Sequence, residues 1–110
     1  MAGKYSYKFT PEAQSDLDDV LFYIEQELSN SRAAEGLATE LFEKIDRVRE
    51  FPLSGRAVDN EFIIDQTLRK FVAGKYIVFY KPDKEAKNII IVRIVYGGRN
   101  MDEILKTMKF

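Results

Sequence analysis

The sequence predicts an α+β domain in which a helical hairpin packs on an antiparallel sheet. Two β-prone runs, Tyr76–Lys81 and Asn88–Tyr96, flank the turn-rich segment Pro82–Lys87, which indicates a hairpin of strands. Two amphipathic segments precede this hairpin, and a shorter one ends the chain. A chain of 110 residues supports one core and is too short for two, so we expect a single domain over residues 1–110.

The N-terminal half predicts one strand followed by two helices. Tyr5–Thr10 alternates in polarity, as a half-buried strand does. Thr10-Pro11-Glu12 begins a helix, with threonine as the cap, proline at the first position and an acid in the first turn. The apolar stripe of this helix consists of Ala13, Leu17, Val20, Leu21, Ile24 and Leu28. Ser29-Asn30-Ser31 breaks the pattern and can cap a second helix, with a stripe from Ala34 to Val48. So short a connection predicts an antiparallel hairpin.

The C-terminal half predicts three strands and a short helix. Residues 57–66 are poorly periodic and are expected to form a connecting loop. Thr67–Val72 predicts a strand, and Ala73-Gly74-Lys75 a tight turn into the hairpin. Asn100 or Asp102 can cap the last helix. We therefore expect an N-terminal strand, an antiparallel helical hairpin packed on a three- to four-stranded antiparallel sheet, and a short C-terminal helix. The first strand needs a helical crossover to join that sheet.

Both faces of the predicted sheet are apolar. Strict alternation places Tyr76, Val78 and Tyr80 on one face, and Ile77 and Phe79 on the other. In the last strand, one face carries Ile89, Ile91, Arg93 and Val95, and the other carries Ile90, Val92, Ile94 and Tyr96. Two amphipathic helices cover only one face, so the sequence predicts that the other face stays open. A large open apolar face is typical of a site for a protein partner.

Composition excludes several classes of site. The chain has no cysteine and no histidine, which removes disulfides, thiolate chemistry and the usual zinc ligands. We therefore expect no metal and no cofactor, and any catalysis would use carboxylates, lysine, arginine or tyrosine. No apolar run approaches the roughly 18 residues of a membrane span. The N-terminus lacks the apolar region of a signal peptide, which favours a cytoplasmic protein without a membrane partner.

Charge is distributed unevenly along the chain. Residues 1–50 carry six Lys/Arg and eleven Asp/Glu, a net charge of −5, whereas residues 51–110 carry eleven and seven, a net charge of +4. The strand-forming half is thus the only candidate for meeting an anion. An overall pI near 5.5 argues against broad binding to nucleic acid, although a local basic patch is compatible with it.

Five stretches occur in order over nearly the whole chain: LDDVLFYI, NSRAAEGLATELFEKI, FPLSGR, LRKFVAGKYIVFY and IVRIVYGGRN. This ordered set resembles the toxins of the ParE/RelE superfamily, from bacterial type II toxin–antitoxin modules. Ala33-Ala34 and the Pro52…Gly55-Arg56 element are more similar to the ParE branch. The resemblance implies a RelE/ParE-like fold. It implies a protein of the kind associated with plasmid stabilisation, which arrests growth until a co-expressed antitoxin neutralises it.

The two branches imply different targets. ParE-like members are described as DNA gyrase poisons, and RelE-like members cut messenger RNA on the ribosome. The gyrase reading is preferred here, with target contacts at Arg69, Arg99, Asn100, Leu105, Met108 and Phe110. The alternative is a metal-independent endoribonuclease with Lys70 and Arg99 as catalytic cations. Ile77 and Leu105 depart from the ribonuclease pattern, since they stand where that branch has an arginine and an aromatic or acid–base residue.

The antitoxin is expected to cover the open apolar face. The residues expected to bind it are Tyr76, Val78, Tyr80, Arg93 and Tyr96. The same face could also support a homodimer or a heterotetramer with the antitoxin. Structural alternatives stay open for single residues: Arg93 can form a partly buried ion pair, and the tyrosines can simply pack. A family member that binds its antitoxin without being toxic is a third alternative.

Overall fold

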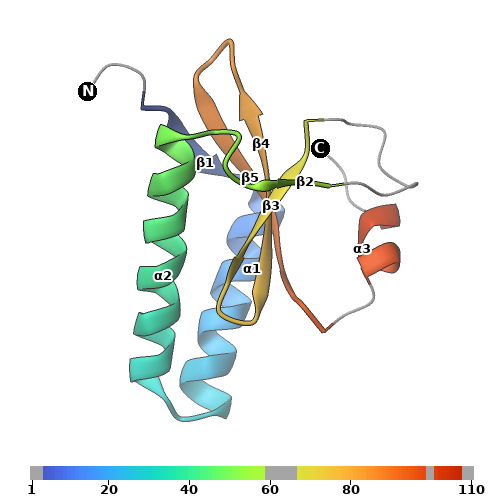
Figure 1. The fold of residues 1–110 in the computed structure, drawn as a ribbon. Coiled ribbons are helices and arrows are strands. Elements are labelled where there is room, and N and C mark those ends of the chain that lie inside the picture. Colours follow the sequence, from blue (N-terminus) through green and yellow to red (C-terminus); the bar gives the residue numbers. More distant parts are fainter. Residues whose placement is uncertain (1–3, 59–66, 99–100, 108–110) are drawn as a thin grey trace.

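The computed structural model describes residues 4–58, 67–98 and 101–107 as one α+β unit (Figure 1). Its strands are β1 (Ser6–Phe9), β2 (Arg56–Ala57), β3 (Arg69–Ala73), β4 (Tyr76–Asp83) and β5 (Asn88–Tyr96). They form one sheet in the order β1-β5-β4-β3-β2. β1 runs parallel to β5, which the predicted antiparallel sheet did not include, and the other pairs are antiparallel. The sheet is therefore mixed and has one more strand than expected, because β2 was not recognised in the sequence.

The capping residues and apolar stripes in the sequence account for the two long helices. They are α1 (Pro11–Phe22), extended by the π-helical turn η1 (Tyr23–Glu27), and α2 (Ser31–Glu50). The Thr10 hydroxyl accepts the Ala13 N–H at 3.1 Å, and the Asn30 side chain accepts the Ala33 N–H at 2.9 Å. Figure 1 shows α1 and α2 side by side on one side of the sheet, with α3 (Met101–Thr107) on the other. None of the described helices is long and apolar enough to cross a bilayer.

The core under the helical hairpin is the larger of two. Its central side chains come from both helices and from the helix-facing side of β3, β4 and β5. They are Ala13, Leu17, Leu41, Ile45, Val48, Ala73, Val78, Tyr80, Ile89, Ile91 and Ile94, and we call them the first core. Tyr76, Val78 and Tyr80 therefore point toward the helices, and Val78 and Tyr80 are fully buried. They do not form the open apolar face that the sequence predicted.

The opposite face of the sheet is not open either. Its apolar side chains are buried together with two residues of α3, and this second core consists of Leu68, Phe79, Val92, Val95, Ile104 and Leu105. Leu105 is only 5% exposed, so the short C-terminal helix contributes to burying the face that the long helices leave. The expectation that only two helices shield the sheet was wrong, because the apolar stripe of α3 was not assigned to a face.

A β-bulge explains why the predicted alternation in β5 fails. Phe79 pairs with Arg93, but the next residue, Tyr80, pairs with Ile91, so Val92 is an extra residue. One added residue moves every later side chain to the other face. As a result Ile94 joins Ile91 in the first core, whereas Val92 lies in the second core.

Candidate functional site

The loop between α2 and β3 is held by two side chains of the sheet. The Tyr80 hydroxyl accepts the Gly55 N–H and donates to the Pro52 carbonyl, both at 2.9 Å. Arg69 donates from Nε to the Gly55 carbonyl at 2.9 Å and from its terminal nitrogen to the Leu53 carbonyl at 3.1 Å. A Cβ on Gly55 would lie 2.4 Å from the Tyr80 oxygen, so only glycine fits at this position. Burial raises the pKa of Tyr80, which keeps the hydroxyl protonated.

This network gives Arg69 a structural role. Its half-buried guanidinium donates to loop carbonyls, and its predicted contact with the target stays a prediction. The loop in turn carries β2 and fixes Arg56 against the edge of β3. The FPLSGR element therefore positions Arg56 in β2, opposite Lys70 of β3.

A row of cations crosses the α3 side of the sheet. Arg56 pairs with Lys70, Lys70 with Phe79, and Phe79 with Arg93, so these four side chains share one face. Phe79 lies in the second core, which identifies the face. Arg56 is exposed and Lys70 is half-buried. Within the part of the chain that the structure describes, neither makes a side-chain hydrogen bond or ion pair.

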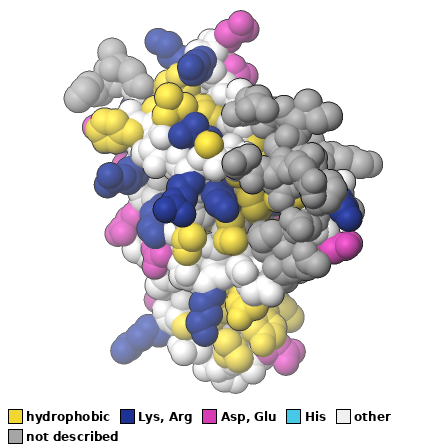
Figure 2. All heavy atoms as spheres, turned by 45° about the vertical axis from the view of Figure 1, so that its right-hand side comes forward, with side chains coloured by type: hydrophobic (Ala, Val, Ile, Leu, Met, Phe, Trp, Pro, Cys, Tyr) yellow, Lys and Arg dark blue, Asp and Glu magenta, His cyan; other side chains and the backbone are white. Residues whose placement is uncertain are grey.

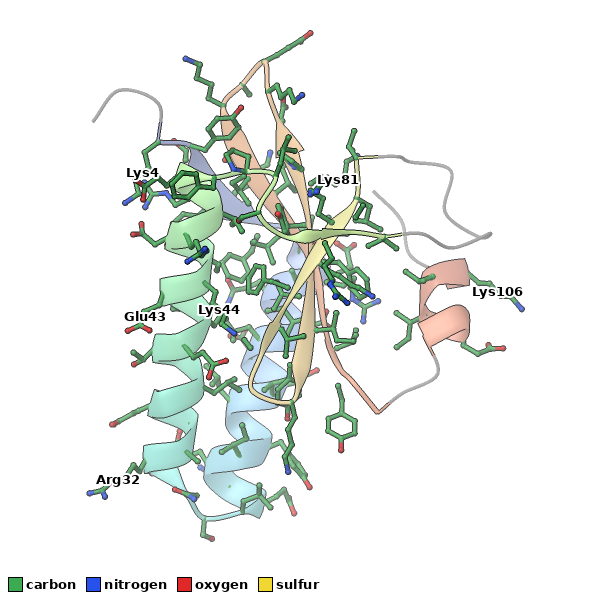
Figure 3. The ribbon with its side chains drawn as sticks, viewed as in Figure 1. Lys4, Arg32, Glu43, Lys44, Lys81 and Lys106 are labelled. Carbon is green, nitrogen blue, oxygen red and sulfur yellow. The ribbon has the colours of Figure 1, made fainter. Side chains whose placement is uncertain are left out.

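Two like charges directly opposite each other on neighbouring strands are destabilising unless an anion joins them. Figure 2 shows dark blue Lys and Arg side chains gathered across the middle of the visible face. A groove of about 520 Å³ beside Arg69 is lined by three cations, Arg69, Lys81 and Lys84, and by two acids, Asp83 and Glu85. Figure 3 places Lys81 at the sheet, on β4. Together these cations form the described surface best suited to an anionic target.

Because β1 and β2 are short, part of β5 and part of β3 have no neighbouring strand on one side. Side chains at the start of α1 and from α2 bind backbone groups along these two stretches. β1 reaches only Ile91 of β5, and beyond it Asp16 accepts the Ile94 N–H at 2.9 Å and two Arg93 nitrogens at 2.7 and 3.1 Å. The Thr10 hydroxyl donates to the Val92 carbonyl at 2.9 Å. Arg93 is thus the partly buried ion pair that the sequence allowed, and Asp16 raises the pKa of its guanidinium.

At the opposite edge, β2 reaches only Lys70 of β3. Beyond it, Lys44 extends from α2 to the Val72 carbonyl (Figure 3), and Glu40 accepts the Gly74 N–H at 2.7 Å. At each edge, helix side chains therefore bind two backbone groups, which disfavours addition of a further strand there.

A tyrosine cluster lies at the far end of the helical hairpin. The rings of Tyr76 and Tyr96 meet edge to face with centroids 5.9 Å apart. Burial, and then the neighbouring hydroxyls of Tyr23 and Tyr96, raise the pKa of Tyr76. These side chains line a groove of about 500 Å³, which we call the tyrosine groove: Asp19, Val20, Tyr23, Leu28, Lys75, Tyr76 and Tyr96.

The predicted site residues therefore do not come together as one site. Tyr76 and Tyr96 lie in the tyrosine groove, Lys70 and Arg93 in the cation row, and Val78 and Tyr80 in the first core. Leu105 is buried in the second core and offers no free surface. The predictions for Arg99, Asn100, Met108 and Phe110 fall outside the described residues. Among the described residues no group of three Asp or Glu is arranged to hold a metal.

Sequence reasoning missed three residues. Arg56, Asp16 and Tyr23 were not among the predicted site residues. The strand pairing of Arg56 had a usable signal, since Arg56 directly follows a Pro…Gly loop that returns the chain to the sheet. Asp16 lies 77 positions from Arg93 in the sequence, and no local pattern connects them.

Comparison with known proteins identifies the family of the chain. Residues 7–101 match the family model described as "ParE toxin of type II toxin-antitoxin system, parDE". The chain belongs to the ParE toxin family. No curated relative matches the sequence. The ParE-family fold is similar to three toxin–antitoxin structures, each under 25% identical, so these add evidence for the fold alone.

The first is the chromosomal ParDE system from P. aeruginosa, at 18% identity and a TM-score of 0.65, covering 86% of this chain and 98% of that one. The second is the archaeal RelE–RelB complex from Pyrococcus horikoshii OT3, at 19% identity and a TM-score of 0.60, covering 88% and 99%. The third is the RelBE2 complex from Mycobacterium tuberculosis, at 21% identity and a TM-score of 0.58, covering 84% and 98%.

Proposed function

We propose that this ParE-family toxin arrests growth by acting on DNA gyrase in the cytoplasm and is neutralised by a cognate antitoxin. The family assignment supports a toxin of a type II module. The cation row supplies the surface for an anionic target. Arg56 and Lys70 offer an anionic target two cations with no partner among the described residues, on a face whose neighbours are apolar.

The observation that favours gyrase over RNA cleavage is the packing of Ile77 and Leu105. Cutting RNA by its own 2′-hydroxyl needs a proton acceptor, a proton donor and charge stabilisation at the phosphate. Ile77 and Leu105 stand where the ribonuclease branch has functional groups, and both pack in the second core. Neither side chain can transfer a proton or stabilise phosphate charge.

One observation keeps the ribonuclease as the second candidate. Lys70 is half-buried beside Arg56, and such a pair suits a phosphate as well as it suits a protein carboxylate. Arg99, the other proposed catalytic cation, belongs to the undescribed part of the chain. Whether the toxin forms a homodimer or a heterotetramer with its antitoxin stays a prediction.

The decisive experiment compares both targets with the same protein. Purified toxin is added to gyrase with supercoiled DNA, and the accumulation of cleavage complexes is measured. The same toxin is added to translating ribosomes, and cleavage of the messenger RNA is measured. We expect cleavage complexes with gyrase and intact messenger. Messenger cut at codon boundaries with gyrase unaffected would reverse the assignment.

Charge-removal variants locate the contact. Arg56→Ala and Lys70→Ala are each expected to weaken gyrase inhibition by about tenfold, the effect of losing one charged contact. Lys8→Ala on β1 is the matched control, since Lys8 is an exposed lysine of the strand at the opposite edge of the sheet. Equal activity of all three variants would exclude the cation row as the target surface.

A further inference from the structure

The strand that carries Arg56 offers little by itself to hold that residue in place. β2 consists of Arg56 and Ala57 alone, and Figure 1 shows it at the edge of the sheet beside β3. The Val58 N–H extends the pairing by one bond, to the Leu68 carbonyl at 3.0 Å. So short a ladder is weak without support from other contacts. The position of Arg56 therefore depends on groups outside β2.

These groups bind Gly55, the residue directly before Arg56. The Tyr80 hydroxyl accepts the Gly55 N–H, and Arg69 Nε donates to the Gly55 carbonyl, each at 2.9 Å. The Gly55 carbonyl and the Arg56 N–H belong to the same planar peptide unit. Arg69 therefore fixes the plane from which Arg56 continues, and Tyr80 fixes the plane before it.

Tyr80 binds the loop from a rigid position. Its side chain is fully buried in the first core, where its ring contacts that of Phe71 with centroids 5.9 Å apart. One oxygen accepts from Gly55 and also donates to the Pro52 carbonyl at 2.9 Å. Phenylalanine would fill the same space, but both loop groups would lose this partner. The hydroxyl therefore connects the core to the loop and contributes more than packing.

Arg69 is a second, separate attachment point. Its guanidinium binds two loop carbonyls at once, those of Gly55 and Leu53. Between these points the loop makes its own turn, in which the Ser54 N–H bonds the Phe51 carbonyl at 2.9 Å. A lysine ammonium on a flexible chain does not reproduce the planar fork of arginine. The loop is thus held along its length before any target arrives.

This support matters because Arg56 pairs with another cation. Arg56 lies opposite Lys70 on the neighbouring strand, and like charges in this arrangement repel each other. On a loosely held strand, Arg56 would move away from Lys70. A pair that is already in place binds an anion without first ordering the loop, which strengthens binding.

We propose that Tyr80 and Arg69 are positioning residues for the cation row: they hold Gly55 so that Arg56 stays opposite Lys70, and they thereby set the affinity of the toxin for its anionic target. The part of this proposal that concerns affinity rests on the proposed function. The part that concerns the position of β2 rests on the contacts of Gly55 alone.

A double-mutant cycle on the intact toxin tests the effect on affinity, because a positioning residue acts through Arg56 and a merely structural one does not. Tyr80→Phe is expected to weaken gyrase inhibition by about fivefold in the parent, and by less than about twofold in the Arg56→Ala background. Tyr5→Phe is the matched control, since Tyr5 is a half-buried tyrosine that packs against the first core just before β1. It is expected to inhibit as the parent does.

Arg69→Lys tests the second attachment point while keeping its charge. It is expected to weaken inhibition by about threefold in the parent and to have no further effect in the Arg56→Ala background. A direct contact between Arg69 and the target would instead weaken inhibition equally in both backgrounds. That result would overturn the positioning role of Arg69.

Amide hydrogen exchange measures the position of β2 without any target. The Val58 amide, which bonds the Leu68 carbonyl, is expected to exchange about tenfold faster in Tyr80→Phe than in the parent. The control is the Thr10 amide at the other end of the sheet, which bonds the Ile91 carbonyl at 2.9 Å and should keep its rate. Equally faster exchange at both amides would indicate a general loss of stability and would overturn the proposal.

Two further results would overturn it. One is unchanged exchange at Val58 in both Tyr80→Phe and Arg69→Lys, and the other is an equal loss of inhibition from Tyr80→Phe with and without Arg56. Failure of the proposed function gives a different result, in which the parent toxin cuts messenger RNA and leaves gyrase unaffected. The same cycle is then measured on messenger cleavage, and the exchange experiment decides the position of β2 in either case.

Discussion

The two bare edges of the sheet are closed by different kinds of chemistry. At the β5 edge, Asp16 binds Arg93 through two nitrogens and also accepts the Ile94 N–H. At the β3 edge, Glu40 pairs with Lys44 at 3.3 Å, and each also binds one backbone group. The Arg93 and Asp16 side chains are 24% and 17% exposed, against 43% and 42% for Lys44 and Glu40.

This difference in burial decides which edge contributes to stability. Removing one partner of a partly buried ion pair leaves the other charge uncompensated. When an exposed pair is broken, water can bind the remaining group instead. We therefore expect the side-chain contacts at the β5 edge to contribute to the free energy of unfolding. The β3 edge serves mainly to block strand addition.

The largest effect is expected for Asp16→Ala. It leaves Arg93 without its carboxylate and the Ile94 N–H without its acceptor, so the free energy of unfolding should fall by about 2–3 kcal/mol. Denaturant unfolding measures this. Asp16→Asn keeps an acceptor for the amide and should lose less. A loss below about 0.5 kcal/mol in the alanine variant would show that burial does not distinguish the edges.

Thr10→Val comes next. The hydroxyl both caps α1 and donates to the Val92 carbonyl, so its removal should cost about 1–2 kcal/mol. Thr10→Ser retains both bonds and should stay within a few tenths of the parent. No loss of stability in Thr10→Val would show that the two bonds of the hydroxyl do not stabilise the fold.

The local signals in the sequence explain why most elements could be predicted. Thr10, Pro11 and Asn30 mark the helix starts by chemistry that acts within three residues, and the structure confirms both caps. The family itself was identified from an ordered set of motifs.

Features that depend on distant pairing could not be predicted. The bulge at Val92 has no mark in the sequence, yet it reverses the faces of the rest of β5. Coverage of the second face depends on α3, a short helix whose docking no periodicity specifies. The missing assignment of α3 produced the expectation of an open face, and exposed apolar side chains lie instead in the tyrosine groove.

Gly74→Ala tests the turn at the β3 edge. Gly74 has a φ of +59°, and a Cβ would lie 3.1 Å from Leu37, so alanine should destabilise the protein by about 1 kcal/mol. Thermal unfolding measures the loss. Gly36→Ala in the middle of α2 is the control, since its Cβ would meet nothing within 4 Å and alanine favours a helix. That variant should be as stable as the parent or more so, and a loss equal to that of Gly74→Ala would refute the turn argument.

The smallest effect concerns pH at the β3 edge. The Gly74 N–H, and then Lys44, lower the pKa of Glu40 below its ordinary 4.5. A carboxyl with a depressed folded-state pKa stabilises the protein above its unfolded pKa and loses this contribution as pH falls through the folded value. Because the pair is exposed, the contribution should stay below about 0.5 kcal/mol. The stability difference between the parent and Glu40→Gln should therefore be small at pH 7, vanish in acid below pH 4.5 and shrink with salt. A difference as large as that of Asp16→Asn, unaffected by salt, would mean that the two edges are equivalent after all.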